Sequence, residues 1–188
     1  MDPQADEEWQ LLSEDPAYSS WVTVKRRTFQ MPDGEVSEWD VVKGSRTVAV
    51  VARVPSGDFL LVRQFRPGPM KVLDELPGGY GRDGESIEET AARELLEETG
   101  YRASSIEVIG SNWMTANSTV ERFVALAIGC TKVADPEFDR DEFGKVLVVD
   151  TPTFIALVRS GELTDQGVAY RVLDHLGLLA EATPTTSG

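Results

Sequence analysis

The chain has 188 residues, 41% of them hydrophobic, and a formal net charge of −14, because 32 Asp and Glu outweigh 18 Lys and Arg. This length and composition suit one folded core, and the negative charge argues against nucleic acid or an anionic membrane as a partner. No apolar run is long enough to span a membrane, and residues 1–14 are acidic and polar, unlike a signal peptide.

The N-terminal part is predicted to contain a hairpin. Residues 1–18 are polar and acidic, so we expect them to be poorly ordered. Residues 21–31 alternate in polarity, and a Pro-Asp-Gly turn follows at 32–34. Residues 35–42 then form the second, returning strand. We therefore predict a β-hairpin over 19–45 that stands outside the main domain.

The main domain, predicted over residues 46–180, begins with two apolar strands at 48–54 and 59–65, joined by a Pro-Ser-Gly-Asp turn. Four glycines follow within a short stretch, at Gly78, Gly79, Gly81 and Gly84. They predict a close-approach loop and not a strand.

A helix is predicted over residues 87–99. Ser86 with Glu89 forms a capping box, and Gly100 supplies the stop. The helix carries three glutamates at helical spacing within about a third of its circumference, where like charges repel. They are Glu94, Glu97 and Glu98. A divalent cation would remove that repulsion, whereas a solvated acidic face is the alternative interpretation.

Further strands are expected at 106–110, 121–129 and 146–150, followed by helices at 152–160 and 166–179 and a disordered tail at 181–188. Strands surrounding a central helix, with a helix pair at the end, indicate a mixed α+β class. No internal repeat is present.

Residues 79–101 read G-x5-E-x7-R-E-L-x-E-E-x-G-Y. This resembles the signature of the Nudix hydrolases at every fixed position except the last, where Tyr101 replaces a branched aliphatic residue. The resemblance implies the Nudix fold, an α/β/α sandwich with a mixed sheet, plus the N-terminal hairpin extension. It also implies two sets of site residues: the metal ligands Glu94, Glu97, Glu98 and the carbonyl of Gly78, and the residues that shape the loop and helix, Gly79, Glu85, Arg93 and Gly100. An ion pair within the helix is the structural alternative for Arg93.

Oxygen-only ligands favour a hard cation, Mg²⁺ with Mn²⁺ as an alternative, and roughly one to three ions are expected. Zinc would require His or Cys, and the chain has one of each. His175 stands alone in an apolar segment and is expected to be structural or exposed. Cys130 excludes an internal disulfide, is expected to be a buried thiol, and fits a reducing compartment, so we expect a cytoplasmic protein.

The segments beside the signature resemble ADP-ribose pyrophosphatases. Residues 63–66 (Arg-Gln-Phe-Arg) and 75–79 (Glu-Leu-Pro-Gly-Gly) match substrate-gripping runs of that subgroup, and residues 161–165 (Gly-Glu-Leu-Thr-Asp) match one of its turns. The resemblance makes Arg66 and Glu75 candidates for substrate binding, with Arg63 a weaker one. An Arg–Glu pair on the surface is the alternative.

Downstream, residues 114–121 occupy the place of a run that carries a proline in members preferring ADP-ribose, and Ala116 stands at that position. The neighbouring Trp113 either stacks on a base or belongs to the core, and the core is favoured. The same resemblance implies a general base on the loop before the last strand, which here is the acidic segment 134–143. The candidates are Glu142, then Asp141, then Asp139, with Glu98 as a competitor.

Together these residues predict a Mg²⁺-dependent enzyme that cleaves the pyrophosphate of a nucleoside diphosphate sugar, with ADP-ribose giving AMP and ribose 5-phosphate. One alternative is hydrolysis of another nucleotide sugar or a nucleoside triphosphate. Another is a regulatory Nudix module that binds nucleotide without cleaving it. By resemblance, we expect a homodimer in which the hairpin arm at 19–45 reaches the partner subunit.

Overall fold

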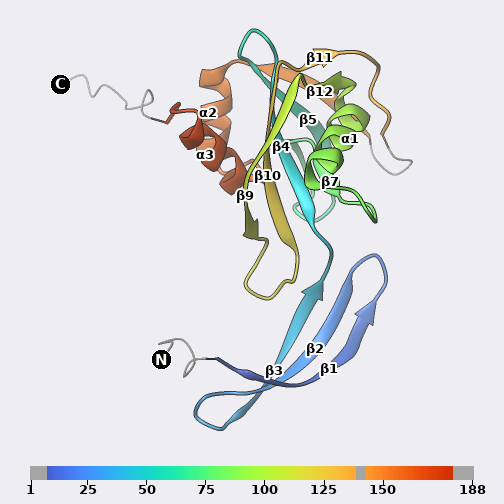
Figure 1. Ribbon diagram of the computed structural model, residues 1–188, viewed down its shortest axis with the longest axis vertical. Helices are drawn as coiled ribbons and strands as arrows, with labels where there is room; N and C mark the ends of the chain where they lie inside the picture. The colour runs from blue at the N-terminus through green and yellow to red at the C-terminus, as the bar shows by residue number, and fades with distance from the viewer. Residues whose placement is uncertain (1–7, 139–142, 180–188) are drawn as a thin grey trace, which may run out of the picture. The chain divides into compact units, whose positions relative to one another are not determined.

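The computed structural model describes residues 8–138 and 143–179 (Figure 1). The chain divides into two compact units. Unit 1 comprises residues 1–46 and 113–121, and unit 2 comprises residues 47–112 and 122–188. The segment 113–121 belongs to unit 1 because it pairs with the strand at Val42, whose N–H donates to the Asn117 carbonyl at 2.9 Å and whose carbonyl accepts from the Thr119 N–H at 2.9 Å.

Unit 1 contains an antiparallel sheet with the order β1-β2-β3, formed by β1 (Gln10–Ser19), β2 (Thr23–Gln30) and β3 (Val36–Lys43). Strands β2 and β3 form the predicted hairpin. Strand β1 lies where weak order was expected, so the structure differs from that expectation over residues 10–18. The strand is held by contacts across the sheet, including an ion pair of 2.7 Å between Arg27 Nε and Glu14 Oε2.

One face of this sheet carries an apolar cluster beside the Arg27–Glu14 pair, and the other face carries a second ion pair. The strand register places Leu11 opposite Phe29, and Trp9 packs edge-on against Phe29 and Trp39 on the same face. On the other face Arg26 pairs with Asp40 at 2.9 Å. Among the described residues of unit 1, the buried hydrophobic side chains are limited to Val41 and Val120, so most of the apolar face is exposed.

Unit 2 is built on a seven-stranded mixed sheet. Its path is β12-β5-β4-β10-β9, with β6 added to β5 and β7 added to β4. The parallel pair is β4 with β10, and β4 with β5 forms the second predicted hairpin. The strands are β4 (Thr47–Arg53), β5 (Phe59–Arg66), β6 (Lys71–Glu75), β7 (Gly78–Tyr80), β9 (Ser105–Trp113), β10 (Glu121–Ile128) and β12 (Gly144–Val149), and β8 (Tyr101–Arg102) forms a small separate sheet with β11 (Thr131–Lys132).

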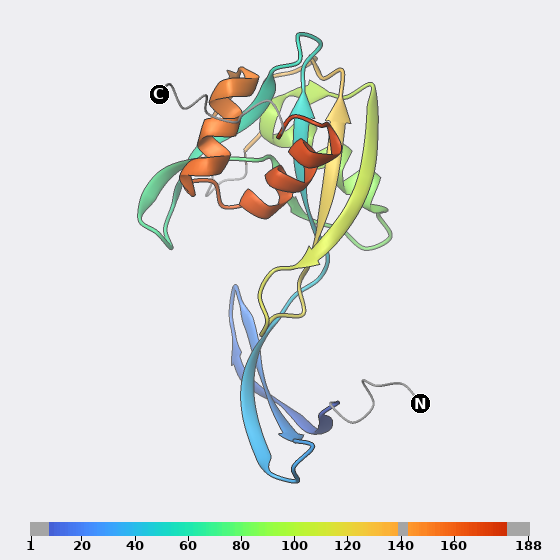
Figure 2. The same cartoon turned by 90° about the vertical axis from the view of Figure 1, so that its left-hand side faces the viewer.

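Helices cover both faces of this sheet. Helix α1 (Ile87–Thr99) lies on one face, and α2 (Thr151–Ser160) with α3 (Gln166–His175) lies on the other (Figure 1, Figure 2). Strand β4 is apolar throughout because it is buried on both sides: Val48 and Val50 face the core of α1, and Ala49 and Val51 face the core of α2 and α3. The predicted α+β class and α/β/α sandwich are confirmed.

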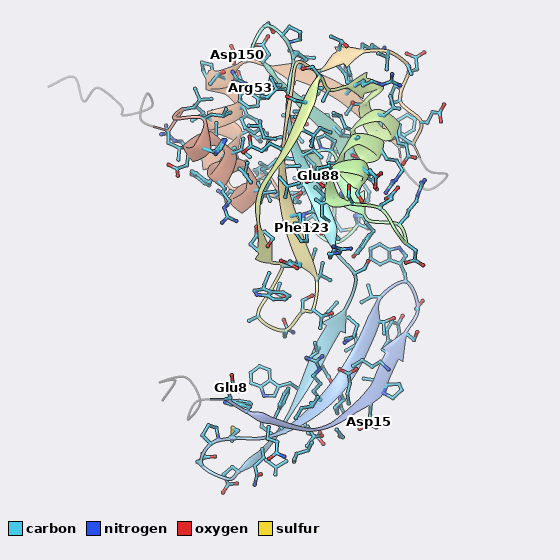
Figure 3. The ribbon with its side chains drawn as sticks, viewed as in Figure 1. Glu8, Asp15, Arg53, Glu88, Phe123 and Asp150 are labelled. Carbon is cyan, nitrogen blue, oxygen red and sulfur yellow. The ribbon has the colours of Figure 1, made fainter. Side chains whose placement is uncertain are left out.

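The helix boundaries follow local signals. Helix α1 has the predicted bounds, and α2 begins where the Asp150 carboxylate accepts the Thr153 N–H at 2.9 Å (Figure 3). Helix α3 ends at His175, short of the predicted residue 179. No helix among the described residues is both long and apolar enough to cross a membrane.

The prediction of a loop without strand at Gly78 and Gly79 is wrong, because these residues form β7, which pairs with β4. The two backbones come so close that a Cβ atom at Gly78, which has φ +156°, would stand 2.2 Å from the Val48 carbonyl oxygen. The glycine permits both the backbone conformation and the close approach. The expected glycine requirement is therefore correct, although the secondary structure is not.

Candidate active site

The candidate site is built on α1, whose ends are fixed by the sequence. The Ser86 hydroxyl accepts the Glu89 N–H at 3.1 Å, and the Glu89 carboxylate accepts the Ser86 N–H at 2.8 Å, which completes the predicted capping box. At the other end Gly100 adopts the left-handed conformation and closes the helix. Ile87, Ala91 and Leu95 are buried against the sheet, so the intervening charged residues lie along one flank of the helix.

Arg93 connects the charged residues of this flank with one another and with the preceding loop. Its guanidinium donates to Glu85 Oε1 at 2.8 Å and to the Tyr80 carbonyl at 2.9 Å, which ties α1 to the loop before it. One nitrogen, Nη1, also donates to Glu94 at 2.7 Å and to Glu97 at 3.0 Å. The guanidinium holds the pKa of the Glu85 carboxyl down to about 2, with the Arg82 N–H assisting. Arg93 therefore makes both the intrahelical pair considered as its structural alternative and the contacts to the preceding loop.

Glu94 and Glu98, one helical turn apart, both reach β7. The Gly78 N–H donates to Glu98 Oε2 at 2.9 Å. Glu94 lies so close to Gly79 that a Cβ atom there would stand 2.5 Å from Glu94 Oε1. Burial raises the pKa of the Glu94 carboxyl above its usual range, although the hydrogen bond from Arg93 acts in the opposite direction.

The candidate ligand atoms fit a hard divalent cation in kind. Two carboxylates and the backbone of β7 approach one another, and all of the candidate ligand atoms are oxygen. Among the described residues, however, no group of three or more Asp, Glu, His or Cys side chains is already arranged to hold an ion. Glu97 is paired with Arg93 and with Arg82, at 3.3 Å, so part of the expected repulsion is already neutralised by arginine.

The substrate-binding candidates lie on β5 and β6 and are paired with each other or with neighbours. Arg63 forms a two-pronged pair with Asp74, at 2.6 and 2.8 Å. Arg66 Nε donates to Glu75, whose side chain is only 2% exposed. The pair considered as the alternative is therefore present for Arg66 and Glu75, but it is buried at the Glu75 end and not a surface pair.

The three loop candidates for the base, Asp139, Asp141 and Glu142, lie outside the described residues. The loop that carries them is anchored to the site at its start, because the Glu137 N–H donates to the Glu97 carbonyl at 2.7 Å. This contact joins the loop to the helix of the predicted ligands. A backbone contact of this kind leaves no signal in the residue pattern, so the sequence did not reveal it.

The remaining sequence predictions concern the burial of three single residues. Trp113 is 66% exposed, so the core placement favoured from the sequence is wrong. Cys130 is fully buried, as predicted, and burial raises the pKa of its thiol to about 11. His175 is partly exposed and lies 3.8 Å from Glu107, which agrees with the expected structural or exposed position.

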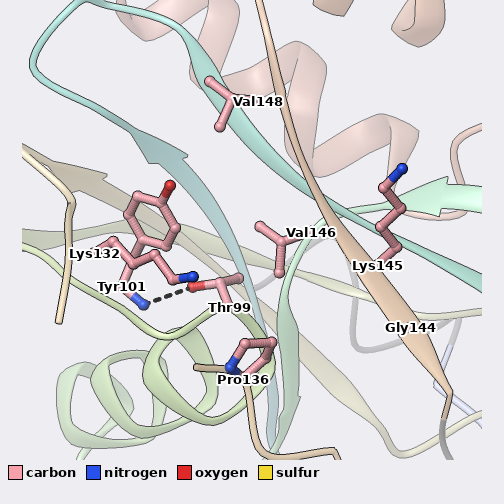
Figure 4. A pocket seen from close by; sticks show the side chains of 8 residues that line it. All are labelled: Thr99, Tyr101, Lys132, Pro136, Gly144, Lys145, Val146 and Val148. Carbon is pink, nitrogen blue, oxygen red and sulfur yellow. Dashed lines mark hydrogen bonds between the residues drawn. The ribbon is translucent and has the colours of Figure 1, made fainter. Parts of the chain in front are cut away.

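A cavity of about 360 Å³ lies beyond the C-terminal end of α1 (Figure 4). Its wall includes Thr99, Tyr101 and Lys132, and none of the predicted metal ligands or arginines lines it. The cavity is therefore separate from the carboxylate flank. Tyr101, the last residue of the signature, packs partly on the core and partly borders this cavity.

Comparison with known proteins identifies the family. A family model described as NUDIX domain matches residues 43–150, more than half of the chain. The chain belongs to the Nudix family. An ADP-ribose pyrophosphatase of Bacillus subtilis (strain 168) is 34% identical to this Nudix protein over 146 residues, which cover 76% of the chain and 78% of the relative.

Two further matches agree with this assignment. An ADP-sugar pyrophosphatase of Mus musculus is 34% identical over 109 residues, covering 52% of the chain and 48% of the relative. A crystal structure of an ADP compounds hydrolase superposes with a TM-score of 0.77 at 18% identity, covering 92% of this chain and 97% of that one. The likeness to the solved structure shows the Nudix fold. The relatives named ADP-ribose pyrophosphatase and ADP-sugar pyrophosphatase confirm the resemblance to the ADP-ribose pyrophosphatase subgroup.

Proposed function

We propose that this Nudix protein hydrolyses the pyrophosphate bond of a nucleoside diphosphate sugar, with ADP-ribose as the leading substrate and AMP and ribose 5-phosphate as products. The observation that carries the proposal is the approach of Glu94 and Glu98 to the glycines of β7. It occurs in a chain similar to proteins named ADP-ribose and ADP-sugar pyrophosphatases.

Each residue of the site has a proposed role. Glu94, Glu97, Glu98 and the Gly78 carbonyl would hold Mg²⁺, with Mn²⁺ as an alternative and roughly one to three ions bound. A bound divalent cation neutralises charge on the phosphate oxygens and makes a water molecule more acidic. Arg93 orients the glutamates, and Arg66 offers N–H groups suited to a phosphate. Glu142, Asp141 or Asp139 would accept the proton of the attacking water, with Glu98 as the competing base.

A second substrate within the same chemistry is another nucleotide sugar or a nucleoside triphosphate. Ala116, at the place of the proline associated with ADP-ribose preference, favours this alternative. A GDP-mannose pyrophosphatase of Yersinia enterocolitica, 26% identical over 160 residues, is among the relatives. A non-catalytic module is less well supported, because this chain retains every carboxylate of the signature.

Product analysis tests the proposal directly. The protein is incubated with ADP-ribose, other nucleotide sugars, dinucleoside polyphosphates and nucleoside triphosphates, with Mg²⁺ or with EDTA, and the products are separated by chromatography. We expect AMP release that is fastest from ADP-ribose and absent with EDTA. Faster cleavage of another compound would make that compound, and not ADP-ribose, the preferred substrate. Tight nucleotide binding without any turnover would favour the regulatory module.

We also propose a homodimer formed through unit 1. The exposed apolar face of the β1-β2-β3 sheet supports it, because a single sheet layer with few buried side chains requires a partner surface. A cytoplasmic location is proposed from the free, buried Cys130. Fractionation of cells that produce the protein would test the location.

A further inference from the structure

A buried polar cluster lies at the end of β5, outside the carboxylate flank of α1. Its centre is Glu75, whose side chain is 2% exposed. One carboxylate oxygen, Oε2, accepts from Gln64 Nε2 at 3.0 Å and from Arg66 Nε, and the other, Oε1, accepts from the Thr164 hydroxyl at 2.7 Å. Both oxygens are therefore occupied by donors from the protein.

The cluster joins three segments that are distant in sequence. Gln64 and Arg66 lie on β5, Glu75 ends β6, and Thr164 lies in the turn between α2 and α3, 89 residues from Glu75. The same turn is anchored on both sides of Thr164, since Leu163 is buried and Asp165 accepts from Arg122 Nε at 2.8 Å. Thr164 is thus held in place independently of Glu75.

Arg66 is the member of the cluster that faces outward, with 39% of its side chain exposed. Among the described residues, its hydrogen bonding uses Nε, which leaves the two terminal nitrogens for other acceptors. A guanidinium fixed at Nε presents the paired N–H groups that match a phosphate. A buried carboxylate needs donors on both oxygens, so the loss of the Thr164 hydroxyl would leave Oε1 unsatisfied and allow the Glu75 carboxylate, and Arg66 with it, to change orientation.

We propose that Glu75, Thr164 and Gln64 are positioning residues that orient the Arg66 guanidinium toward the substrate phosphate, and that Glu75 does not itself contact a ribose. The expected effect on KM rests on the proposed function. Glu75 thereby has the task of orienting Arg66 in place of direct sugar recognition, and Thr164 has a role in substrate affinity.

The test compares three variants of the full chain. Thr164→Val removes the hydroxyl while keeping the shape, and Thr164→Ser keeps the hydroxyl. Thr47→Val is the matched control, because Thr47 is a buried threonine whose hydroxyl has no hydrogen-bond partner among the described residues. The readouts are KM and kcat for the best substrate, and the ¹⁵N–¹H signal of Arg66 Nε, assigned by its loss in Arg66→Lys.

We expect Thr164→Val to raise KM by about five- to tenfold with kcat changed less than about twofold, and to shift the Arg66 signal. Thr164→Ser and Thr47→Val should leave both readouts near those of the unaltered protein. An unchanged Arg66 signal and KM in Thr164→Val, or an equal rise in KM in Thr47→Val, would overturn the inference. If no substrate is cleaved but the signal shifts only in Thr164→Val, the positioning holds and the proposed function fails.

Discussion

At the scale of single residues, Arg93 changes the argument for a metal. Three glutamates on one flank repel one another, and a divalent cation is one source of the missing positive charge. The guanidinium of Arg93 already bonds to Glu94 and Glu97, so repulsion by itself does not require an ion. The stronger argument is positional, because Glu98 and Glu94 both reach the glycine backbone of β7, and at Gly78 only a residue without a Cβ atom fits beside the backbone of β4.

Glu97→Gln separates catalysis from folding. Glu97 is 37% exposed, with Arg93 donating to one carboxylate oxygen and Arg82 to the other, and the single oxygen of a glutamine can keep one of these two hydrogen bonds. We expect kcat to fall by about two orders of magnitude or more, because an anionic ligand is lost, while Tm changes by less than about 2 °C. The matched control is Glu88→Gln, which alters an exposed glutamate in the first turn of the same helix. Full activity in Glu97→Gln under Mg²⁺ would contradict its assignment as a ligand.

At the scale of the elements, local signals predicted structure well and distant contacts did not appear in the sequence. The capping box at Ser86 and the stop at Gly100 act within one turn, so the bounds of α1 were predicted correctly. Strands β1 and β7 depend on their partners, β1 through Arg27 and Glu14 and β7 through its close approach to β4. Neither contact is visible in a local pattern of polarity.

The same division applies to the site. The spacing of the signature placed Glu94 and Glu98 on one flank because a helix has a fixed period. It could not reveal that Glu75 is enclosed by Gln64 and Thr164, because the chain brings Thr164 there only when the turn after α2 packs on β5 and β6. Burial, which decides between a sugar contact and a supporting role, is a property of the folded chain.

Asp150, the N-cap of α2, gives a pH-dependent prediction at this scale. The hydrogen bond from Thr153 to its carboxylate lowers its pKa from the ordinary value of 3.8. A lowered pKa means that the carboxylate stabilises the fold fully above the unfolded value and loses this effect as pH falls through the folded value. We expect Asp150→Ala to lower Tm by about 2–4 °C at pH 7, with a smaller difference from the unaltered protein near pH 3.

Thermal melts of three proteins would measure this effect. Asp150→Asn keeps a capping oxygen and removes the charge, so its Tm at pH 7 should lie close to that of the unaltered protein. Its difference from Asp150→Ala should stay nearly constant with pH, because neither variant titrates at this position. A gap between Asp150→Ala and the unaltered protein that widened toward pH 3 would reverse the sign and contradict the assignment.

At the scale of the whole molecule, the polarity of unit 1 raises the question of what covers its sheet. One face, called here the apolar face, carries Leu11, Phe29 and Trp39 beside the Arg27–Glu14 pair, and the other face carries the Arg26–Asp40 pair. A sheet with one apolar face requires burial of that face to be stable, and a second copy of the chain would supply an equivalent surface. The net charge of −14 opposes association, so apolar contact has to outweigh charge repulsion between the copies.

Light scattering after size-exclusion chromatography tests the dimer. At micromolar concentration we expect twice the chain mass of 20.6 kDa. Trp39→Glu places a charge on the apolar face and should give the monomer mass, because an unpaired buried charge at an interface is costly. Val36→Glu is the matched control, since the register puts exposed Val36 on the opposite face of the same strand, and it should leave the dimer intact. A monomer mass for the unaltered protein would discard the dimer, and equal dissociation by both variants would place the contact elsewhere than on the apolar face.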